Sequence, residues 1–429
     1  MNPEAIEMNE IIKKHPAVYE LLSERGKAIF FPKKGILSQS ADAKGKKINA
    51  TIGIALEDDG SSMRLSSIQK QLNISPEMAF PYAPSYGRQD IREKWKSMLY
   101  EKNPSLKGKE ISLPIVTCAL THGLSMVGYL FLDKQDKVVT PDLFWENYEL
   151  IFKNNYDAEL ELFQSFDGDK FNIKALKSRL EAKKGKIVLL LNFPNNPTGY
   201  TPTIDEAKSI VKIIEESADK GNNILVIIDD AYFGLVYEDN IIKESIFSML
   251  ADLHENVLAV KVDGPTKEEY VWGFRVGFIT YGIKNSTKEI YTALESKTAG
   301  AIRSSISNAP NLSQSLLLNA YNSPDYKEEK KEKYKILKKR YEEVKKILKN
   351  KKYKEFFEPL PFNSGYFMCV QVKKGINAEQ VRQTLLKKYD TGVIVFNDLI
   401  RIAFSATPTG KIPELFENIY NACKDECQN

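Results

Sequence analysis

The sequence predicts an α/β protein in which a mostly parallel sheet carries helices on both faces and a smaller domain follows. Apolar runs at residues 187–191, 224–228 and 257–262 are typical of buried parallel strands, and a helical pattern at 204–220 separates the first two. Such alternation of strands and helices favours a parallel sheet. A length of 429 residues is also too great for one ordinary domain, so we expect at least two.

Composition argues against several classes of protein. Apolar residues make up 42% of the chain and charged residues 28%, which is ordinary for soluble domains. The net charge is +4, from 61 basic and 57 acidic residues dispersed along the chain, so we expect no nucleic-acid partner. No apolar run reaches the length of a membrane span, and acidic residues interrupt the N-terminal stretch where a signal peptide would lie. We therefore expect a cytoplasmic protein with no membrane partner.

Cysteine and histidine are both scarce. The cysteines are Cys118, Cys369, Cys423 and Cys427, and the histidines are His15, His122 and His254. The cysteines are too few and scattered for a disulfide framework, and the histidines are not spaced for a metal site, so we expect no metal. An enzyme of this composition would carry protons on a lysine or a carboxylate, or leave the difficult step to a cofactor.

The first third of the chain mixes loops with short elements. We expect helices at about residues 1–28, 88–100 and 117–132 and strands at 115–117 and 138–140. A short apolar run at 48–56, broken by Gly53, belongs to an arm or to the start of a small domain. The third helix follows a small polar turn, so the backbone N–H groups of residues 119–122 lie at its N-terminus, where an anion is favoured. The last strand ends in PDLFWENY, which carries Trp145 and Tyr148. Aromatic residues at a strand end are more often core than cofactor contacts.

Three later strands end in polar clusters. These clusters are NFPNNPTG at 192–199, DDAY at 229–232 and DGPTKEEYVWGFRVGF at 263–278, which contains Lys267 and Arg275. A further strand is expected after the Lys267 loop, at residues 272–281. Asn-Pro and Asp-Asp pairs also form ordinary turns, and a loop lysine is usually a solvated charge. Because ligands of open α/β sheets bind at the carboxyl ends of the strands, we nevertheless expect one site there.

The C-terminal part predicts a smaller domain entered through a long helix. We expect an amphipathic helix at 326–354, strands at 366–372, 393–396 and 400–404, and helices at 377–388 and 412–425. The domain division that we predict is residues 1–62 as an N-terminal arm and part of the small domain, 63–325 as the large domain and 326–429 as the small domain. Neither a P-loop nor a GxGxxG fingerprint is present, which argues against nucleotide-driven chemistry.

Four motifs occur in a fixed order along the chain: NNPTG, DxAY, a lysine followed eight residues later by the arginine of GFRVG, and RIAFS. In this combination the chain resembles the class I/II aminotransferases of fold type I, which use pyridoxal 5′-phosphate. The resemblance covers about residues 48–405. It implies a large domain that binds the cofactor on a mostly parallel sheet flanked by helices, and a smaller α+β domain.

The resemblance assigns the cofactor contacts. It implies that Lys267 binds the cofactor aldehyde and moves the substrate proton, while Asp229 keeps the ring nitrogen protonated. Asn196 and Tyr232 would donate hydrogen bonds to the phenolic oxygen, and Arg275 would pair with the phosphate. Asp230, the neighbour of Asp229 in DDAY, would point the other way along the strand.

Further contacts are implied by position. The amides of Thr121 and His122 would bind the phosphate, and Trp145 would stack on the ring, with Tyr148 as the alternative. Tyr82 matches a tyrosine that reaches the phosphate of a neighbouring subunit, which implies a homodimer with active sites at the interface. The chain departs from the family pattern at two points: Gly264 stands where a serine is usual, and Ala119 where a glycine is common. Whether Thr266 compensates is left open.

Substrate recognition follows from the same comparison. Arg401 resembles the arginine that binds the substrate α-carboxylate in a bidentate manner, and the amide of Gly53 could add a contact. Arg303, in IRSSISN, matches the arginine that reaches across the dimer to a side-chain carboxylate, or it is a surface charge. Ser307 and Asn308 accompany it in the same motif.

Together these residues imply a transfer of the amino group between an L-amino acid and a 2-oxo acid in two half-reactions. Aspartate, glutamate or an aromatic amino acid would be the donor. The alternatives are a β-lyase or a decarboxylase on the same fold, or a non-catalytic ligand-sensing relative.

Overall fold

The computed structural model describes residues 1–32 and 35–428, and the predicted segments 1–62 and 326–429 include the remaining positions. Its centre is a seven-stranded sheet of order β2-β10-β9-β8-β7-β3-β4. All neighbouring pairs are parallel except those that involve β10, which is antiparallel to β2 and β9. The strands are β2 Ile115–Thr117, β3 Lys137–Pro141, β4 Glu159–Phe163, β7 Lys186–Asn192, β8 Asn223–Asp229, β9 Val257–Asp263 and β10 Gly277–Gly282. The predicted α/β fold with a mostly parallel sheet is confirmed.

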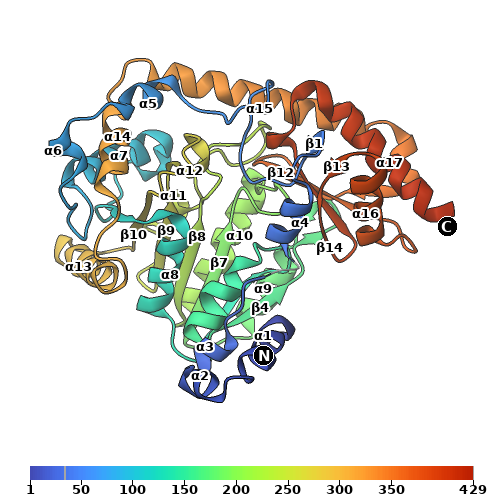
Figure 1. Ribbon diagram of the computed structural model, residues 1–429. Helices are drawn as coiled ribbons and strands as arrows, with labels where there is room; N and C mark the ends of the chain where they lie inside the picture. The colour runs from blue at the N-terminus through green and yellow to red at the C-terminus, as the bar shows by residue number, and fades with distance from the viewer. Residues whose placement is uncertain (33–34, 429) are drawn as a thin grey trace.

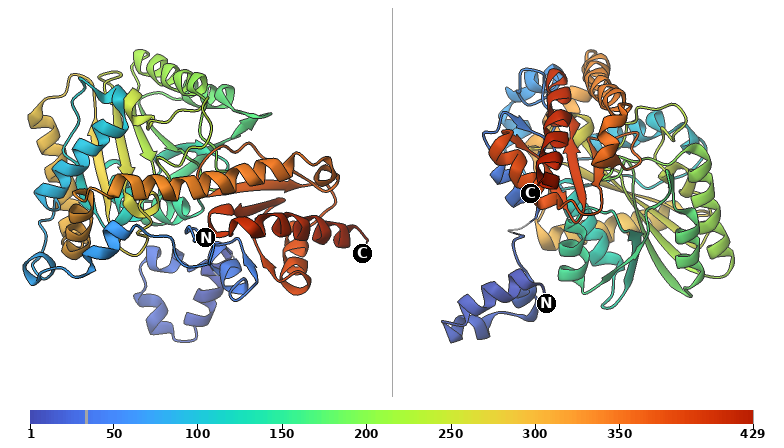
Figure 2. Two further views of the ribbon diagram at one scale, coloured as in Figure 1. Left: turned by 90° about the horizontal axis from the view of Figure 1, so that it is seen from above. Right: turned by 90° about the vertical axis from the view of Figure 1, so that its right-hand side faces the viewer.

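Helices cover both faces of this sheet (Figures 1 and 2). α8 packs on β9 and β10, and α10 packs on β8 and β9. The inner strands are therefore buried on both sides, which is why β7, β8 and β9 read as mostly apolar runs, with Lys261 the exception inside β9. The helices of this part are α5 Ser66–Gln69, α6 Pro76–Ala79, α7 Gln89–Lys102, α8 Ala119–Phe131, α9 Ile173–Glu181, α10 Ile204–Asp219, α11 Phe247–Leu250, α12 Pro265–Glu268, α13 Lys288–Ser305 and α14 Asn311–Tyr321.

The start of α10 shows how the sequence sets an element boundary. Thr203 caps the helix: its hydroxyl accepts a hydrogen bond from the Glu206 amide at 3.2 Å, and the Glu206 carboxylate accepts one from the Thr203 amide at 2.8 Å. This reciprocal pair satisfies two donors at the helix end. The observed start at Ile204 is the predicted one.

Three predicted elements are wrong in their bounds. The long helix expected at 326–354 ends at Leu348. The strand expected at 272–281 begins only at Gly277, because the chain turns before it and Arg275 has a φ of 55°. The N-terminal stretch is not one helix but three short ones, α1 Pro3–Ile12, α2 Pro16–Leu21 and α3 Glu24–Ala28. Pro16 begins α2, since proline fits the first turn of a helix but not its interior. These helices project from the body in Figure 2.

The C-terminal part forms a second, smaller sheet. It is antiparallel, of order β11-β12-β15-β14, with the strands β11 Phe357–Pro359, β12 Phe367–Val372, β14 Ile394–Phe396 and β15 Leu399–Ala403. The N-terminal strand β1 Ile48–Asn49 pairs with β13 Thr391–Gly392, so the chain before the large sheet also contacts this part. Its helices are α4 Ile36–Asp42, α16 Ala378–Lys388 and α17 Ile412–Gln428.

The long helix α15, Tyr326–Leu348, spans both parts along the top of Figure 1. Arg340 is its buried anchor: one Nη donates to the Ser405 carbonyl at 2.5 Å and the other to Asp58 at 2.8 Å. The exact domain boundaries after residues 62 and 325 stay predictions.

Candidate active site

A cavity of about 220 Å³ lies at the carboxyl ends of β7, β8 and β9. It is lined by residues from the large sheet, the small sheet and the N-terminal segment. The predicted site residues that line it are Gly53, Thr121, Trp145, Asn196, Asp229, Tyr232, Lys267, Arg275 and Arg401. The cavity therefore gathers residues that are up to about 350 positions apart, from Gly53 to Arg401, and the parallel strands β7, β8 and β9 deliver those of the large sheet.

Lys267 stands on the short helix α12, directly after β9. The Tyr366 hydroxyl donates to the Lys267 carbonyl at 2.7 Å, which ties this turn to the small sheet. The Lys267 Nζ lies 5.1 Å from the centroid of the Tyr232 ring. Burial lowers the pKa of Lys267 from 10.5 to about 8; Asp229 opposes this shift and Arg275 adds to it. The amine thus loses its proton far more readily than a surface lysine does.

Asp229 ends β8 and is only 2% exposed. One carboxylate oxygen accepts a hydrogen bond from the Tyr148 hydroxyl at 2.5 Å, and the other accepts one from the Ala231 amide at 3.1 Å. Burial raises the pKa of Asp229, while the Tyr148 hydrogen bond and the charge of Lys267 oppose the rise. A cationic N–H in the cavity would compensate this buried carboxylate.

Tyr148 and Trp145 differ in position. Tyr148 is fully buried and supports Asp229, whereas Trp145 lines the cavity and packs edge-on against Tyr148. The geometry therefore favours Trp145 over Tyr148 as the aromatic contact of a bound ring.

Asp230 lies on the other face of the sheet. It contacts the Lys261 amine, and its carboxylate accepts a hydrogen bond from the Ser245 hydroxyl at 2.5 Å. Burial raises the pKa of Asp230 to about 6, although Lys261 opposes the shift. Adjacent residues of a strand point to opposite faces, so only the first aspartate of DDAY faces the cavity.

Arg401, on β15, is a buried cation with an unmet donor. Its Nη atoms donate to the Asn196 carboxamide oxygen at 3.3 Å and to the Thr51 carbonyl at 3.0 Å, and the guanidinium lies 4.4 Å from the centroid of the Phe367 ring. Its Nε has no hydrogen-bond partner in residues 1–32 and 35–428. A carboxylate in the cavity would satisfy this donor.

Only glycine fits at position 199 of the NNPTG loop, because the loop backbone lies directly against the small domain there. Gly199 has a φ of 72°, and a Cβ atom there would lie 2.0 Å from the Phe367 carbonyl oxygen. The Gly199 carbonyl also accepts hydrogen bonds from the amides of Asn363 and Ser364, both at 2.9 Å. The loop that carries Asn196 is thereby held against the strand that precedes Arg401.

At another part of the cavity wall, Thr121 lies in the first turn of α8 and Arg275 in the turn before β10. Arg275 donates to the Trp272 carbonyl at 3.1 Å and is otherwise exposed, so its guanidinium has donors to spare. Ala119, at the position where a glycine is common, has a φ of 60°, the left-handed region that glycine adopts without strain.

The model of one protein family, aminotransferase class I and II, matches residues 46–419. The chain belongs to this family. The resemblance inferred from the four motifs is confirmed. Members of this family depend on pyridoxal 5′-phosphate, and the cavity fits that group: it offers an amine of lowered pKa, a buried carboxylate and an arginine at the helix N-terminus that could receive a phosphate.

Two curated relatives are aspartate aminotransferases. The enzyme of Bacillus sp. (strain YM-2) is 28% identical over 251 residues, 57% of each chain, and that of Sulfurisphaera tokodaii is 27% identical over 274 residues, 62% of each chain. The chain thus spans about three fifths of the length of these relatives. An aminotransferase structure from Anaerococcus prevotii superimposes with a TM-score of 0.83 at 24% identity, covering 94% of this chain and 98% of that one, which shows the same fold.

Three predicted residues do not line the aminotransferase cavity. The ring of His122 accepts a hydrogen bond from the Cys118 amide at 3.0 Å and contacts the Ser305 hydroxyl at 3.0 Å, and burial lowers the pKa of this imidazole to about 4. Tyr82 is 91% exposed, and Arg303 is an exposed side chain that donates to Ser307 at 3.3 Å. Within one chain, neither Tyr82 nor Arg303 reaches the site.

Sequence reasoning missed Ile36 and Phe367, which also line the cavity, and Tyr366, which holds the Lys267 turn. Tyr366 and Phe367 follow the glycine of a turn at the start of β12, a pattern that indicates a strand but carries no chemical signature. Their roles follow only from tertiary packing.

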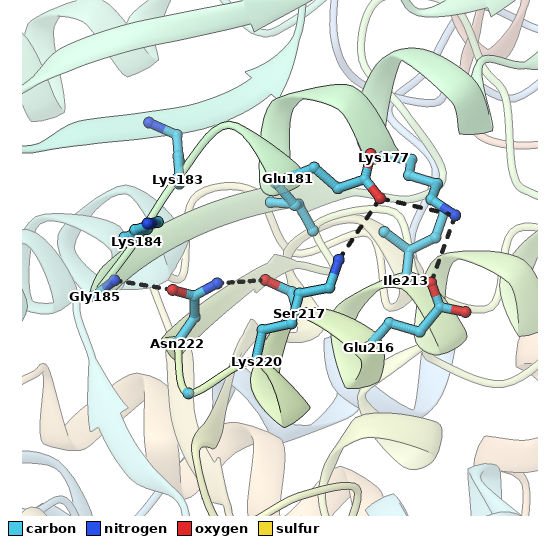
Figure 3. Close-up of a pocket in the computed structure, with 12 residues that line it drawn as sticks. Lys177, Glu181, Lys183, Lys184, Gly185, Ile213, Glu216, Ser217, Lys220 and Asn222 are labelled. Atoms are coloured by element: carbon cyan, nitrogen blue, oxygen red, sulfur yellow. Dashed lines mark hydrogen bonds and ion pairs between the residues drawn. The ribbon is translucent and has the colours of Figure 1, made fainter.

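A second cavity, of about 390 Å³, lies between α9 and α10 on the periphery (Figure 3). Lysines and glutamates line it, and they pair with one another: Lys177 lies 3.6 Å from Glu216 and 3.9 Å from Glu181, and Lys220 lies 3.7 Å from Glu181. None of the predicted site residues lines this cavity. Three of its four lysines pair with glutamates, Lys183 with Glu161 at 2.8 Å, so it is a salt-bridged surface rather than a rival active site.

Neither a metal-binding cluster nor a membrane-spanning helix is found among the described residues. In the part of the chain that the structure describes, no group of three or more His, Cys, Asp and Glu side chains is arranged to hold a metal ion. Within the same residues, no helix combines the length and the apolar character that a membrane crossing requires.

Proposed function

We propose that the protein is a pyridoxal-phosphate-dependent aminotransferase that moves an amino group between an L-amino acid and a 2-oxo acid by a ping-pong mechanism. The observation that carries this proposal is the placement of Lys267, Asp229 and Arg401 in one cavity. The reaction needs a proton carrier, a carboxylate beside the ring nitrogen and a cation for the substrate carboxylate. Lys267 offers an amine of lowered pKa, Asp229 a buried carboxylate and Arg401 an unpaired donor.

The bound cofactor supplies an electron-withdrawing ring that makes loss of the substrate Cα proton feasible. Lys267 would move this proton between the substrate Cα and the cofactor C4′, because its lowered pKa of about 8 leaves part of the amine neutral near neutral pH. Asp229 would hold a proton on the ring nitrogen. Arg401 would bind the α-carboxylate, since its Nε has no other partner among the described residues, and the amide of Gly53, which lines the same cavity, would add a contact.

The remaining side chains adjust and orient the ring. Asn196 and Tyr232 would donate to the phenolic oxygen; burial raises the pKa of Tyr232, so its hydroxyl keeps its proton. Trp145 would contact the ring, while Arg275 and the amides of Thr121 and His122 would bind the phosphate. Each of these residues except His122 lines the cavity, and His122 would contribute only its backbone amide.

The proposed donors are aspartate, glutamate or an aromatic amino acid. Support comes from the names of the relatives, which include aspartate aminotransferases and a probable aspartate/prephenate aminotransferase of Aquifex aeolicus. These names favour transamination over β-elimination or decarboxylation.

We also propose a homodimer in which Tyr82 and Arg303 serve the partner's site. Both side chains are exposed and neither lines its own cavity, and the apolar Phe80 near Tyr82 is 85% exposed. Exposed large apolar side chains at one loop are typical of an interface. Light scattering at micromolar concentration tests the dimer. The cytoplasmic location rests on the sequence argument alone and is tested by cell fractionation.

The test of function is the visible absorption spectrum of the protein with pyridoxal 5′-phosphate. We expect a band that bleaches on addition of L-aspartate, L-glutamate or L-tyrosine and returns with a 2-oxo acid, with L-alanine as the comparison. Bleaching by dicarboxylic amino acids supports the role of Arg303, and bleaching by aromatic or small apolar ones alone removes it. Release of pyruvate and ammonia from a cysteine-like substrate would instead identify a lyase.

A further inference from the structure

Thr266, which immediately precedes Lys267, carries a buried hydroxyl that no role described above uses. We propose that this hydroxyl donates a hydrogen bond to the cofactor phosphate and takes the place of the serine that is usual at position 264. The inference rests on the proposed function, because it concerns how the same cavity holds its cofactor. Three observations carry it. Gly264 has no space for a side chain, the Thr266 hydroxyl has no hydrogen-bond partner among the described residues, and Thr266 lines the cavity.

Position 264 cannot hold a serine without a backbone shift. A Cβ atom at Gly264 would lie 2.8 Å from the Val276 carbonyl oxygen and 2.9 Å from the Gly277 Cα. Both contacts are to backbone atoms, which cannot rotate away as a side chain can. The close approach of the Lys267 turn to the start of β10 therefore excludes any side chain at 264, and the hydroxyl must come from elsewhere.

Thr266 supplies a hydroxyl at the cavity wall. Its side chain is 4% exposed, it lines the cavity beside Lys267, and its Oγ1 has no hydrogen-bond partner among the residues that the structure describes. A buried hydroxyl without a partner destabilises a fold, so such groups are rare outside binding sites. The phosphate oxygens of a bound cofactor would satisfy it, and charge-assisted bonds of this kind are strong.

The surroundings of Thr266 are those of an anion site. A Cβ atom at Gly264 would lie 3.2 Å from the Leu120 side chain, and one at Gly277 would lie 2.7 Å from the Ala119 backbone. Both turns, one carrying Thr266 and the other Arg275, thus pack against the N-terminus of α8. Thr266, Arg275 and Thr121, in the first turn of α8, line the same cavity. A hydroxyl, a guanidinium and the amides of a helix N-terminus are donors that a phosphate dianion prefers.

The test compares T266V with wild type in two measurements. Valine has nearly the shape of threonine, so T266V removes the hydroxyl alone. We expect the affinity for pyridoxal 5′-phosphate, measured by absorption titration of the apoprotein, to fall about 10- to 100-fold, as for loss of a hydrogen bond to a charged group. The melting temperature of the apoprotein should stay unchanged or rise, because T266V removes a buried donor without a partner. T266S should bind like wild type.

The matched control is T280V. Thr280 on β10 is fully buried, and its Oγ1 likewise has no partner in the described part of the chain, but it does not line the cavity. T280V should change the apoprotein melting temperature in the same direction as T266V and leave cofactor affinity unchanged. A second probe is pyridoxal, which lacks the phosphate: T266V and wild type should bind it equally.

The outcomes separate this inference from the proposed function. If wild type binds pyridoxal 5′-phosphate and T266V binds it equally tightly, Thr266 is not a phosphate ligand, while the function stands. Equal weakening toward pyridoxal and pyridoxal 5′-phosphate would also overturn the inference, because the hydroxyl would then act elsewhere than on the phosphate. If wild type itself binds no cofactor, the proposed function fails first.

Discussion

Lys261 and Lys267 lie six residues apart at the end of β9, yet their surroundings give them opposite properties. Lys261 is fully buried and contacts Asp230 and, at 3.2 Å, Asp263. Burial alone would lower the pKa of Lys261, but the two carboxylates outweigh it and raise the pKa. Lys267 faces the cavity with Asp229 on one side and Arg275 on another, and its pKa falls to about 8.

The difference teaches what separates a structural lysine on β9 from a reactive one in the turn that follows it. Two carboxylates in contact keep Lys261 a permanent cation that neutralises the far face of the sheet. One carboxylate that is shared with Tyr148, and a nearby arginine, leave Lys267 close to losing its proton. Burial is common to both, so the balance of neighbouring charges decides the chemistry.

The largest expected effect is that of K267A. Loss of the amine removes both covalent capture of the cofactor and the proton carrier, so the transamination rate should fall at least about 1000-fold. Steady-state assays with L-aspartate and 2-oxoglutarate measure this. Retention of more than a tenth of the wild-type rate would give the reactive role to another residue.

K261M should act on stability instead. It leaves Asp230 and Asp263 buried without their cation, and loss of one partner of a buried ion pair typically costs about 3–5 kcal/mol. Urea unfolding of the apoprotein measures the loss. The control is K243M, whose exposed pair with Asp239 should contribute nothing measurable. A K261M protein as stable as K243M would contradict the structural role.

D229N should lower the rate without unfolding the protein. An amide in place of the carboxylate cannot hold a proton on the ring nitrogen, so we expect a loss of about 100-fold or more in kcat. D230N, at the neighbouring position, should instead destabilise the fold because Lys261 loses a carboxylate partner. Paired kinetic and unfolding measurements test this separation, and a similar kcat for both variants would refute the division between the two faces.

R401K tests the carboxylate contact. Lysine keeps the charge but lacks the planar donor pair, so KM for the amino acid should rise about tenfold, with a smaller change in kcat. Initial rates at varied donor concentration give both values. An unchanged KM would mean that the substrate carboxylate binds elsewhere.

The smallest effect is a shift in pH dependence. Only the neutral amine captures the cofactor, so the rate of capture by the apoprotein should rise with pH through about 8. Asp229 raises the pKa of Lys267 and Arg275 lowers it, so D229N should move the midpoint to lower pH and R275Q to higher pH. Stopped-flow absorbance measures both, and shifts in the same direction would contradict these charges as the cause.

The motif positions could be predicted because chemistry and topology coincide there. Asn196, Asp229 and Lys267 each follow a strand that reads as a continuous apolar run, and parallel strands deliver their ends to one edge. Arg401 could be placed only through the resemblance, since its contacts with Thr51 and Asn196 join segments 350 and 205 residues apart.

Helix α14 was not predicted from the sequence, and the reason is local. α14 buries Gln314 and Ser315 beside leucines, and the Gln314 side chain accepts a hydrogen bond from the Arg88 amide at 2.9 Å. A polar residue on the buried face blurs the helical pattern of apolar residues, so the sequence did not indicate this helix. The unpaired hydroxyl of Thr266 likewise depends on packing that no local pattern encodes.

The central claim is that Lys267, and not its neighbour Lys261, binds the cofactor. Borohydride reduction of the protein with pyridoxal 5′-phosphate, followed by peptide mass spectrometry, tests it directly, because reduction makes the carbon–nitrogen link permanent. We expect the phosphopyridoxyl label on Lys267 and none on Lys261. A label on a different lysine, or no label on the folded protein, would contradict the account.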